Sequence, residues 1–250
     1  AAMGNGAVTG DNNTALGQAA GYQLAGGGNN TLLGQDAGAS ITSADNNVII
    51  GAAAGNAVVG GGENVFIGQG AAAQCTSAGR NVVVGRNANT ATDNGYENVF
   101  GWDVDSAGAD KTTIGSGSAE SEMADGGTTW SAVSDVRTKK NIVSSGIGLD
   151  FIDDLRAVTF NYKTLGELPS DHRRYEENST EIFKKRPEIQ LGFISQEVKT
   201  AMDTHSVPDG SDLWYQDPKG YQWLGETSLI PMLVRAVQEL SAKVKALEDA

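Results

Sequence analysis

The stretch Asn47-Val48-Ile49-Ile50-Gly51 decides the fold of the first half of this 250-residue chain, because its pattern returns every 17 residues. An Asn, three mostly apolar or β-branched residues and a Gly recur at residues 13–17, 30–34, 64–68 and 81–85. Val and Ile suit the pleated surface of a strand, and Asn and Gly tolerate the backbone of a turn. Each phrase therefore predicts one short strand followed by a turn.

A second column of small residues follows each strand and predicts a tight turn. Its members are Met3-Gly4, Ala20-Gly21, Ala37-Gly38, Ala54-Gly55 and Ala71-Ala72. At about 3.3 Å per residue, one period supplies roughly 56 Å of chain, enough for one full coil of a narrow β-solenoid. The spacing shortens to 16 residues at Gly101 and to 14 at Gly115, where the array ends. We predict an all-β solenoid over residues 1–115.

Composition divides the chain near residue 133. Of the 33 glycines, 26 lie in residues 1–133, whereas 15 of the 18 Lys and Arg residues lie in residues 134–250. We expect a linker or irregular fibre tip over residues 116–133 and a second domain over residues 134–250.

The formal net charge of −13 argues against nucleic acid as a partner, because affinity for nucleic acid depends on neutralising phosphates. No apolar run approaches the length of a membrane span, and no signal peptide precedes the repeats, so we expect no membrane insertion. The single cysteine, Cys75, cannot form an internal disulfide, and we expect it to be a buried small residue.

The second domain opens with Ser134-Asp135-Val136-Arg137-Thr138-Lys139-Lys140-Asn141-Ile142. This segment resembles the start of the peptidase S74 family, the self-cleaving intramolecular chaperones of bacteriophage tailspikes and tail fibres, whose phrase is Ser-Asp-x-Arg-x-Lys-x-Asn-Ile. Later landmarks at residues 158–162, 191–198 and 228–240 follow in the family's order. The resemblance covers residues 130–250 and implies an α+β chaperone, a homotrimer and supporting roles for Asp135, Arg137 and Asn141.

Residues 1–115 are similar in style to the β-roll head repeats of trimeric bacterial adhesins. A ligand-binding surface would be one role for such an array, and a rigid shaft is the other. We favour the shaft, because the repeated columns explain packing without a ligand. Asp103 and Asp105 lie two residues apart with no third ligand in sight, so we expect a solvated face and no metal site.

The chemistry expected of the second domain is a Ser-Lys dyad. A serine hydroxyl needs a base, and a lysine can act as one where burial lowers its pKa. The family spacing selects Lys139 rather than Lys140 as the partner of Ser134. Attack of Ser134 on the carbonyl of Val133 passes through a five-membered ring, so we place the cleavage between Val133 and Ser134, with the Ser134–Asp135 bond as the alternative. Without the resemblance, Ser134 would be read as an ordinary turn serine.

The C-terminal segment has the heptad pattern of a coiled-coil helix over residues 229–249. Its apolar positions alternate by three and four: Ile230, Leu233, Val237, Leu240, Val244 and Leu247. Val and Leu at the core positions would alone favour a dimer, whereas the resemblance implies a trimer.

The remaining features complete an α+β domain. We expect a helix over residues 149–155, a strand over residues 157–163, and a strand continuing into a helix over residues 192–202. Residues 164–188 are polar and basic, and we interpret them as a solvated loop or as an arm that reaches back to the acidic solenoid. Trp214 and Trp223 are predicted in the core. No cofactor is expected.

Together these patterns indicate the C-terminal part of a tail fibre or tailspike whose chaperone drives trimerisation and then cuts itself off. The mature part would belong to the virion, where a host surface receptor, a glycan or a protein, is a possible partner, and the released chaperone would remain in the host cytoplasm. The alternatives are a trimeric cell-surface adhesin, a polysaccharide-degrading tailspike and a membrane-tethered transcription factor that uses the same module.

Overall fold

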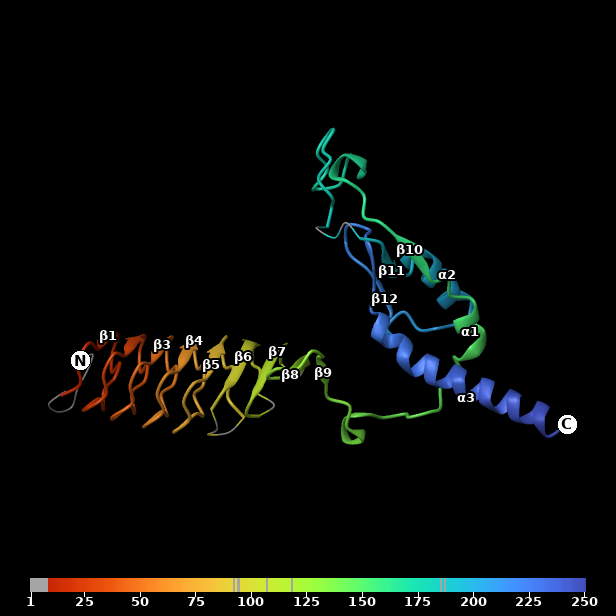
Figure 1. The fold of residues 1–250 in the computed structure, drawn as a ribbon. Coiled ribbons are helices and arrows are strands. Elements are labelled where there is room, and N and C mark those ends of the chain that lie inside the picture. Colours follow the sequence, from red (N-terminus) through yellow and green to blue (C-terminus); the bar gives the residue numbers. More distant parts are fainter. Residues whose placement is uncertain are drawn as a thin grey trace. The chain divides into compact units, whose positions relative to one another are not determined.

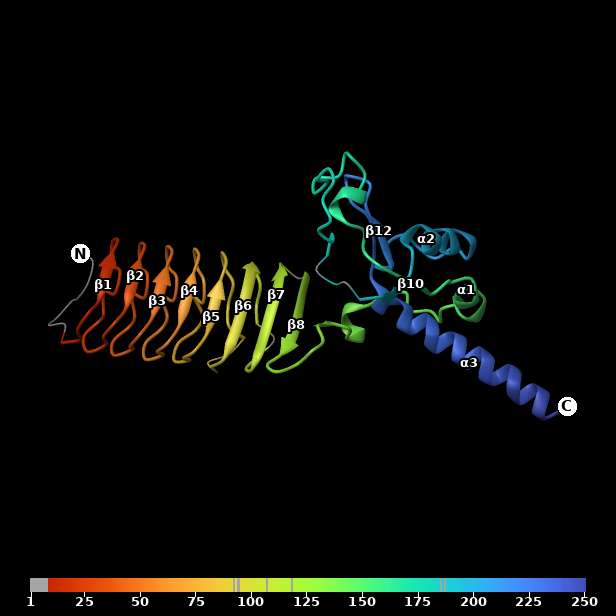
Figure 2. The ribbon, with the colours of Figure 1, turned by 45° about the horizontal axis from the view of Figure 1, so that its top comes forward.

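The chain forms two compact units, Ala1–Lys140 and Asn141–Ala250, drawn in Figures 1 and 2. The computed structural model describes residues 9–91, 93, 95–106, 108–117, 119–184, 186 and 188–250. Met3-Gly4 of the small-residue column and Lys185 of the basic segment lie outside the described residues. The units divide between Lys140 and Asn141, after the boundary between Val133 and Ser134 that composition indicated.

Unit 1 is the predicted β-solenoid. Its nine strands lie in one sheet in chain order, and the first seven are parallel. Residues one coil apart face each other, as Val48 faces Val65. The seven strands are β1 (Thr14–Leu16), β2 (Thr31–Leu33), β3 (Val48–Ile50), β4 (Val65–Ile67), β5 (Val82–Val84), β6 (Glu97–Trp102) and β7 (Lys111–Ser116).

In each of the short strands β2 to β5, only the middle residue is fully buried in the core of unit 1. The middle residue points inward, as in β3, where Ile49 is fully buried and its neighbours Val48 and Ile50 are only half-buried. This alternation follows from the two-residue period of a strand. Cys75 is buried as expected, and burial raises the pKa of its thiol to about 11.

A ladder of buried asparagines joins the coils beside this core. Asn47 Nδ2 donates to Asn30 Oδ1 at 3.0 Å, and Asn64 Nδ2 donates to Asn47 Oδ1 at 3.1 Å. The same oxygens accept the backbone N–H of the next Asn, so each side chain serves two coils. After Asn81 the next residue in the ladder is Glu97, whose backbone N–H donates to Asn81 Oδ1, whereas Asn98 pairs with Val82 of β5. Asn98, which precedes the first glycine at the shorter spacing, Gly101, by three residues, therefore does not extend the ladder.

The glycine that ends each strand is required by the spacing of the coils. Gly51 has a φ of +137°, and a Cβ added there would lie 2.3 Å from the carbonyl oxygen of Gly68 in the next coil. A side chain would therefore force neighbouring coils apart.

The segment expected to be a linker or fibre tip instead continues the sheet. β8 (Ala119–Ala124) pairs antiparallel with β7, and β9 (Ser131–Ala132) pairs with β8. The sequence pattern did not predict β8, because its residues are mostly small or polar and lack the apolar run of the earlier strands. Lys111 of β7 pairs with Glu122 of β8 at 2.9 Å. β8 covers the hydrogen-bonding edge that β7 would otherwise leave open.

Unit 2 is the predicted α+β region ending in a long helix. Phe151 of α1, Met202 of α2 and Leu229 at the start of α3 meet in its core. Its elements are α1 (Leu149–Asp153), β10 (Val158–Phe160), β11 (Gln190–Gly192), α2 (Ser195–Thr204), β12 (Trp214–Gln216), β13 (Gln222–Leu224) and α3 (Leu229–Glu248). β10 pairs antiparallel with β11, and β12 with β13.

The two tryptophans of unit 2 have different environments. Trp214 packs against the core as predicted. Trp223 does not: its side chain is half exposed, and its ring stacks on that of Tyr215 with the centroids 5.9 Å apart. The prediction of a core Trp223 is wrong because alternate residues of β13 point to opposite faces.

The basic segment between β10 and β11 projects from unit 2 as a loop (Figure 1). Its described residues are held by local contacts. Arg174 Nη1 donates to the carbonyl oxygen of Phe183 at 2.8 Å, and His172 packs edge-on against the ring of Phe183.

The ladder predicts a sharp difference between two asparagine substitutions. Asn47→Ala should lower the free energy of unfolding by about 1–3 kcal/mol, because it leaves buried groups on two neighbouring coils without partners. Asn56→Ala, in a turn outside the ladder, should change it by less than about 0.5 kcal/mol. Urea unfolding at one fixed chain concentration measures both values, and equal stabilities would contradict the role of the ladder.

Candidate functional site

A single 3₁₀ turn, Val136–Thr138, positions the residues of the predicted dyad. Asp135 caps the turn: its Oδ1 accepts the backbone N–H of Arg137 at 2.8 Å. The Thr138 hydroxyl donates to the carbonyl oxygen of Asp135 at 2.8 Å, and the Lys139 N–H donates to the carbonyl of Val136. These bonds fold the chain back within five residues. Sequence reasoning missed Thr138, although threonine is common in such turns.

Asp135 and Arg137 form a two-pronged ion pair across this turn. Arg137 Nε donates to Asp135 Oδ1, and Arg137 Nη2 donates to Asp135 Oδ2, both at 2.9 Å. The hydrogen bonds from the Arg137 side chain, followed by the one from its backbone, hold the pKa of the Asp135 carboxyl below its ordinary value. The pair therefore gives the turn a defined geometry at neutral pH.

The turn brings Ser134 and Lys139 together. Lys139 Nζ donates to Ser134 Oγ at 2.6 Å. This is the contact that a lysine base needs in order to take the proton of a serine hydroxyl. Both side chains are exposed in the single chain. Burial disfavours the charged form of a lysine, and neither of these two side chains is buried in the single chain.

The other residues of the motif surround this contact in sequence. Val133, before Ser134, is exposed, so the Val133–Ser134 peptide bond is open to its surroundings. Lys140 is exposed beyond the dyad. Asn141 has a φ of +55°, a left-handed conformation that Asn adopts more readily than most residues.

The predicted coiled-coil positions all lie on an exposed face of α3. The adjoining face of the helix, with Leu229, Met232 and Ala236, is buried in unit 2. The exposed seam comprises Ile230, Leu233, Val237, Leu240, Val244 and Leu247. Within one chain this apolar seam faces solvent.

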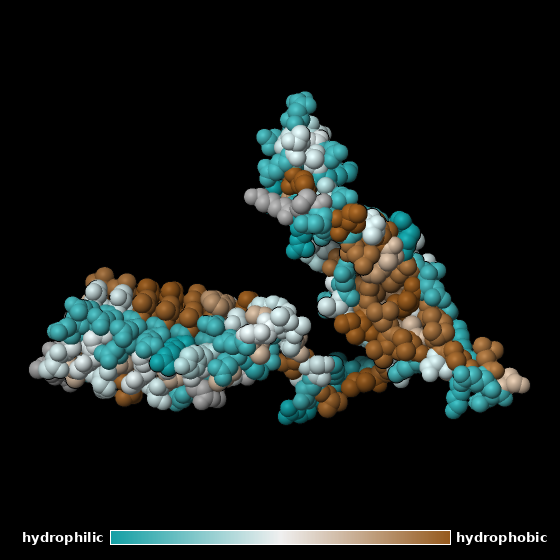
Figure 3. Space-filling model, viewed as in Figure 1, coloured by the Kyte–Doolittle hydropathy of each residue, from teal (hydrophilic) through white to brown (hydrophobic). Residues whose placement is uncertain are grey.

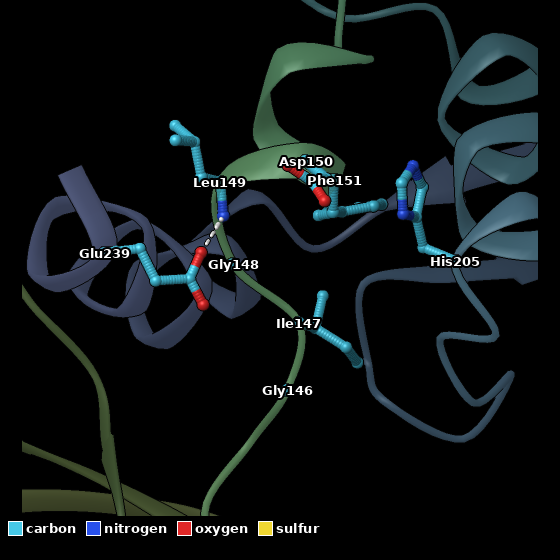
Figure 4. Close-up of a pocket in the computed structure, with 8 residues that line it drawn as sticks. All are labelled: Gly146, Ile147, Gly148, Leu149, Asp150, Phe151, His205 and Glu239. Atoms are coloured by element: carbon cyan, nitrogen blue, oxygen red, sulfur yellow. Dashed lines mark hydrogen bonds between the residues drawn. The ribbon is translucent and has the colours of Figure 1, made fainter. Parts of the chain in front are cut away.

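A hollow of about 360 Å³ beside α1 has a structural role instead (Figure 4). Glu239 of α3 accepts the backbone N–H of Leu149 at 2.9 Å, and this bond is the main reason that the pKa of Glu239 lies below its ordinary value. His205 Nε2 lies 2.7 Å from Asp154 Oδ2 nearby. In this hollow Glu239 therefore links α3 to the start of α1.

Among the described residues, no three His, Cys, Asp or Glu side chains gather in an arrangement that could hold a metal ion. None of the helices in the described part of the chain has both the length and the apolarity of a membrane span.

Comparison with protein families finds a match within the second half of the chain. Residues 134–207 match the Peptidase_S74 family, described as chaperone of endosialidase. The match begins at Ser134 and includes the complete turn, Asn141 and helix α2, whereas the solenoid and α3 lie outside it. No curated protein and no solved structure matches the chain.

The ion pair predicts how Asp135 titrates. A carboxylate-observing NMR titration should give Asp135 a pKa below its ordinary value in the wild-type chain, and Arg137→Ala should return it towards that value. Because the pKa is lowered on folding, the pair's contribution to the turn is complete above the ordinary pKa and is lost as the pH falls through the lowered one. An unchanged titration in Arg137→Ala would contradict the ion pair.

Proposed function

We propose that the chain belongs to a bacteriophage tail fibre or tailspike, and that its Peptidase_S74 domain directs the assembly of three chains before it cuts itself from the solenoid. The observation that carries this proposal is the 2.6 Å contact between Lys139 Nζ and Ser134 Oγ, at the start of the matched segment. A β-solenoid followed by such a chaperone fits a fibre that must be assembled in register.

The proposed reaction is an acyl shift followed by hydrolysis. Neutral Lys139 takes the proton of Ser134 Oγ as the oxygen attacks the carbonyl carbon of Val133. The proton then passes to the amide nitrogen of Ser134 as the C–N bond breaks, which leaves an ester between Val133 and Ser134 Oγ. Water hydrolyses this ester and releases a carboxylate on Val133 and a free amine on Ser134.

Exposure of the dyad supports a link between assembly and cleavage. A lysine can act as a base where its surroundings disfavour the charged form, as burial does. Ser134 and Lys139 are exposed in the single chain. We infer that neighbouring chains cover the turn in the trimer, disfavour the charged lysine and start the reaction. Cleavage would then follow folding without a separate signal.

Two exposed apolar surfaces support self-association, one on each unit. The first is the α3 seam defined above. The second, the outer stripe, is formed by the residue that follows the inward-facing one in each parallel strand: Leu16, Leu33, Ile50, Ile67, Val84, Phe100 and Ile114. Leu16 is 70% exposed and Ile114 48%. Figure 3 shows the apolar band along unit 1 and a second apolar area on unit 2.

The outer stripe repeats with the coils, which makes it suited to a second copy of itself. Identical chains placed parallel would align apolar residues along the whole stripe. Sequence reasoning assigned the strands to packing within one chain and did not recognise that their alternate residues form a second apolar surface. Charged side chains are absent from the outer positions of β2 to β5.

The cleavage proposal is tested on denaturing gels of four proteins. Wild type and Lys140→Ala should give two fragments, residues 1–133 and 134–250. Ser134→Ala and Lys139→Ala should remain intact, with rates lowered at least about a thousandfold. Sequencing the new N-terminus distinguishes cleavage before Ser134 from cleavage before Asp135. Cleavage that survives both dyad substitutions would refute the mechanism.

The trimer proposal is tested by light scattering on uncleavable Ser134→Ala protein. We expect the mass of three chains for this protein and for its Gln238→Asp variant, whose substitution lies off the seam. Leu240→Asp should shift the mass towards one chain, because each buried leucine contributes roughly 1.5–3 kcal/mol. With Ser134 restored, Leu240→Asp should also slow cleavage. A mass of two chains would contradict the trimer.

The same measurement examines the outer stripe. Ile50→Asp should weaken association, whereas Ala52→Asp, in the exposed turn after the same strand, should not. If the Ile50→Asp and Ala52→Asp proteins have equal masses at every concentration, the stripe is not part of the interface.

A further inference from the structure

A polar hollow lies on the solenoid where the repeat begins to shorten. Its volume is about 410 Å³, and its lining includes Gly70, Gln74, Asn87, Asn89, Asp103 and Asp105. It lies in the turns that follow β4, β5 and β6. The hollow is distant in sequence from the cleavage turn and plays no part in the proposed reaction.

The coils stack two pairs of oxygen-bearing side chains beside this hollow. Asn89 forms a parallel bridge with Asp105. Asn89 N–H donates to the carbonyl of Val104 at 2.8 Å, and Ser106 N–H donates to the carbonyl of Asn89 at 2.9 Å. Residues paired in parallel register direct their side chains to the same face. Asn89 therefore points to the side on which Asp105 is exposed, towards the hollow that both residues line.

Asn87 and Asp103 form the second pair, two residues before the first. Both have left-handed backbones, with φ of +53° and +55°, and they occupy equivalent places in successive coils. Asn87 Oδ1 lies over Gly70, where an added Cβ would approach it to 2.8 Å. The absence of a side chain at Gly70 thus leaves room above this amide oxygen.

Earlier coils carry no such array. The same two places hold Ala19 and Gly21, then Asp36 and Gly38, then Ala53 and Gly55. At Gly38 an added Cβ would meet Leu32, Ile41 and Ile49 in the core, so the second place is closed to larger residues in that coil. In the coils that carry β5 and β6, both places hold polar residues, and the Asn89–Asp105 bridge lies at the second place.

The hollow has negative charge and a buried polar atom without a partner. Asp103 and Asp105 are its two carboxylates, and no Lys, Arg or His lines it. Asn89 is only 8% exposed; its Nδ2 donates to the carbonyl of Asn87, whereas its Oδ1 has no hydrogen-bond partner within the described part of the chain. Buried amide oxygens are usually paired, so the unpaired Oδ1 indicates a missing ligand.

We propose that this hollow binds one Ca²⁺ ion. Asp103 and Asp105 would supply charge, Asn87 and Asn89 would supply amide oxygens, and Gln74 and water would complete the shell. Ca²⁺ accepts six to eight oxygens in irregular geometry, whereas Mg²⁺ requires a near-octahedral site and retains its water. The donors are oxygens alone, which disfavours Zn²⁺. The ion links the coils that carry β5 and β6, next to the shortened repeats.

Calorimetric titration of the full chain with CaCl₂ tests the proposal. Two carboxylates place the site in the weak class of calcium sites, with a dissociation constant of about 0.1–1 mM and one ion per chain. Asp103→Asn/Asp105→Asn should abolish this binding. Asp36→Asn, in the equivalent turn of the second coil, should bind as the wild type does. Equal binding by the double variant, or none by the wild type, would overturn the site.

Thermal unfolding supplies a second readout. About 5 mM CaCl₂ should raise the Tm of wild type and of Asp36→Asn relative to chelator, and should leave that of the double variant unchanged. Asn87→Ala, which removes an amide oxygen without changing charge, should weaken calcium binding several-fold and decides the matter if the double variant does not fold. An equal rise with MgCl₂ would refute selection of Ca²⁺.

Discussion

Register between successive coils is the constraint on which unit 1 depends. Backbone hydrogen bonds and the asparagine ladder join each coil to the next at one fixed offset, so a shift by one residue would turn Ile49 outward and Ile50 inward. The same register aligns the outer stripe over β1 to β5. One repeated offset thus produces both a core and a surface for association, and the shortened coil that follows brings Asn89 beside Asp105.

The requirement for register also explains why a chaperone would accompany such a fold. Parallel strands with long connections form slowly, because distant segments must be brought together before any contact stabilises them. Chains held at α3 would begin coiling from a common point. The turn that holds Ser134 and Lys139 directly follows β9, so the proposed cleavage would separate the end of the sheet from the domain proposed to guide it.

Sequence reasoning recovered features that recur or are local. The 17-residue period predicted β1 to β5, and the family phrase placed Ser134 and Lys139 together. It did not recover features set by a changed register. The shortened fifth coil puts Glu97 rather than Asn98 after Asn81, and brings Asn89 to Asp105, a pairing no fixed period predicts. Exposure of the dyad and of Trp223 depends on tertiary packing that short motifs do not encode.

The antiparallel strand β8 ends the parallel stack of coils at β7. β8 closes the edge of β7, and the turn that holds Ser134 and Lys139 comes after this β7–β8 hairpin. The turn would keep that place however many coils precede the hairpin. Whole coils could be inserted between existing ones at about 4.8 Å of length each, provided that every insertion keeps its Asn and Gly. Fibre length could therefore vary by duplication or deletion of 17-residue units without altering the machinery that ends the fibre.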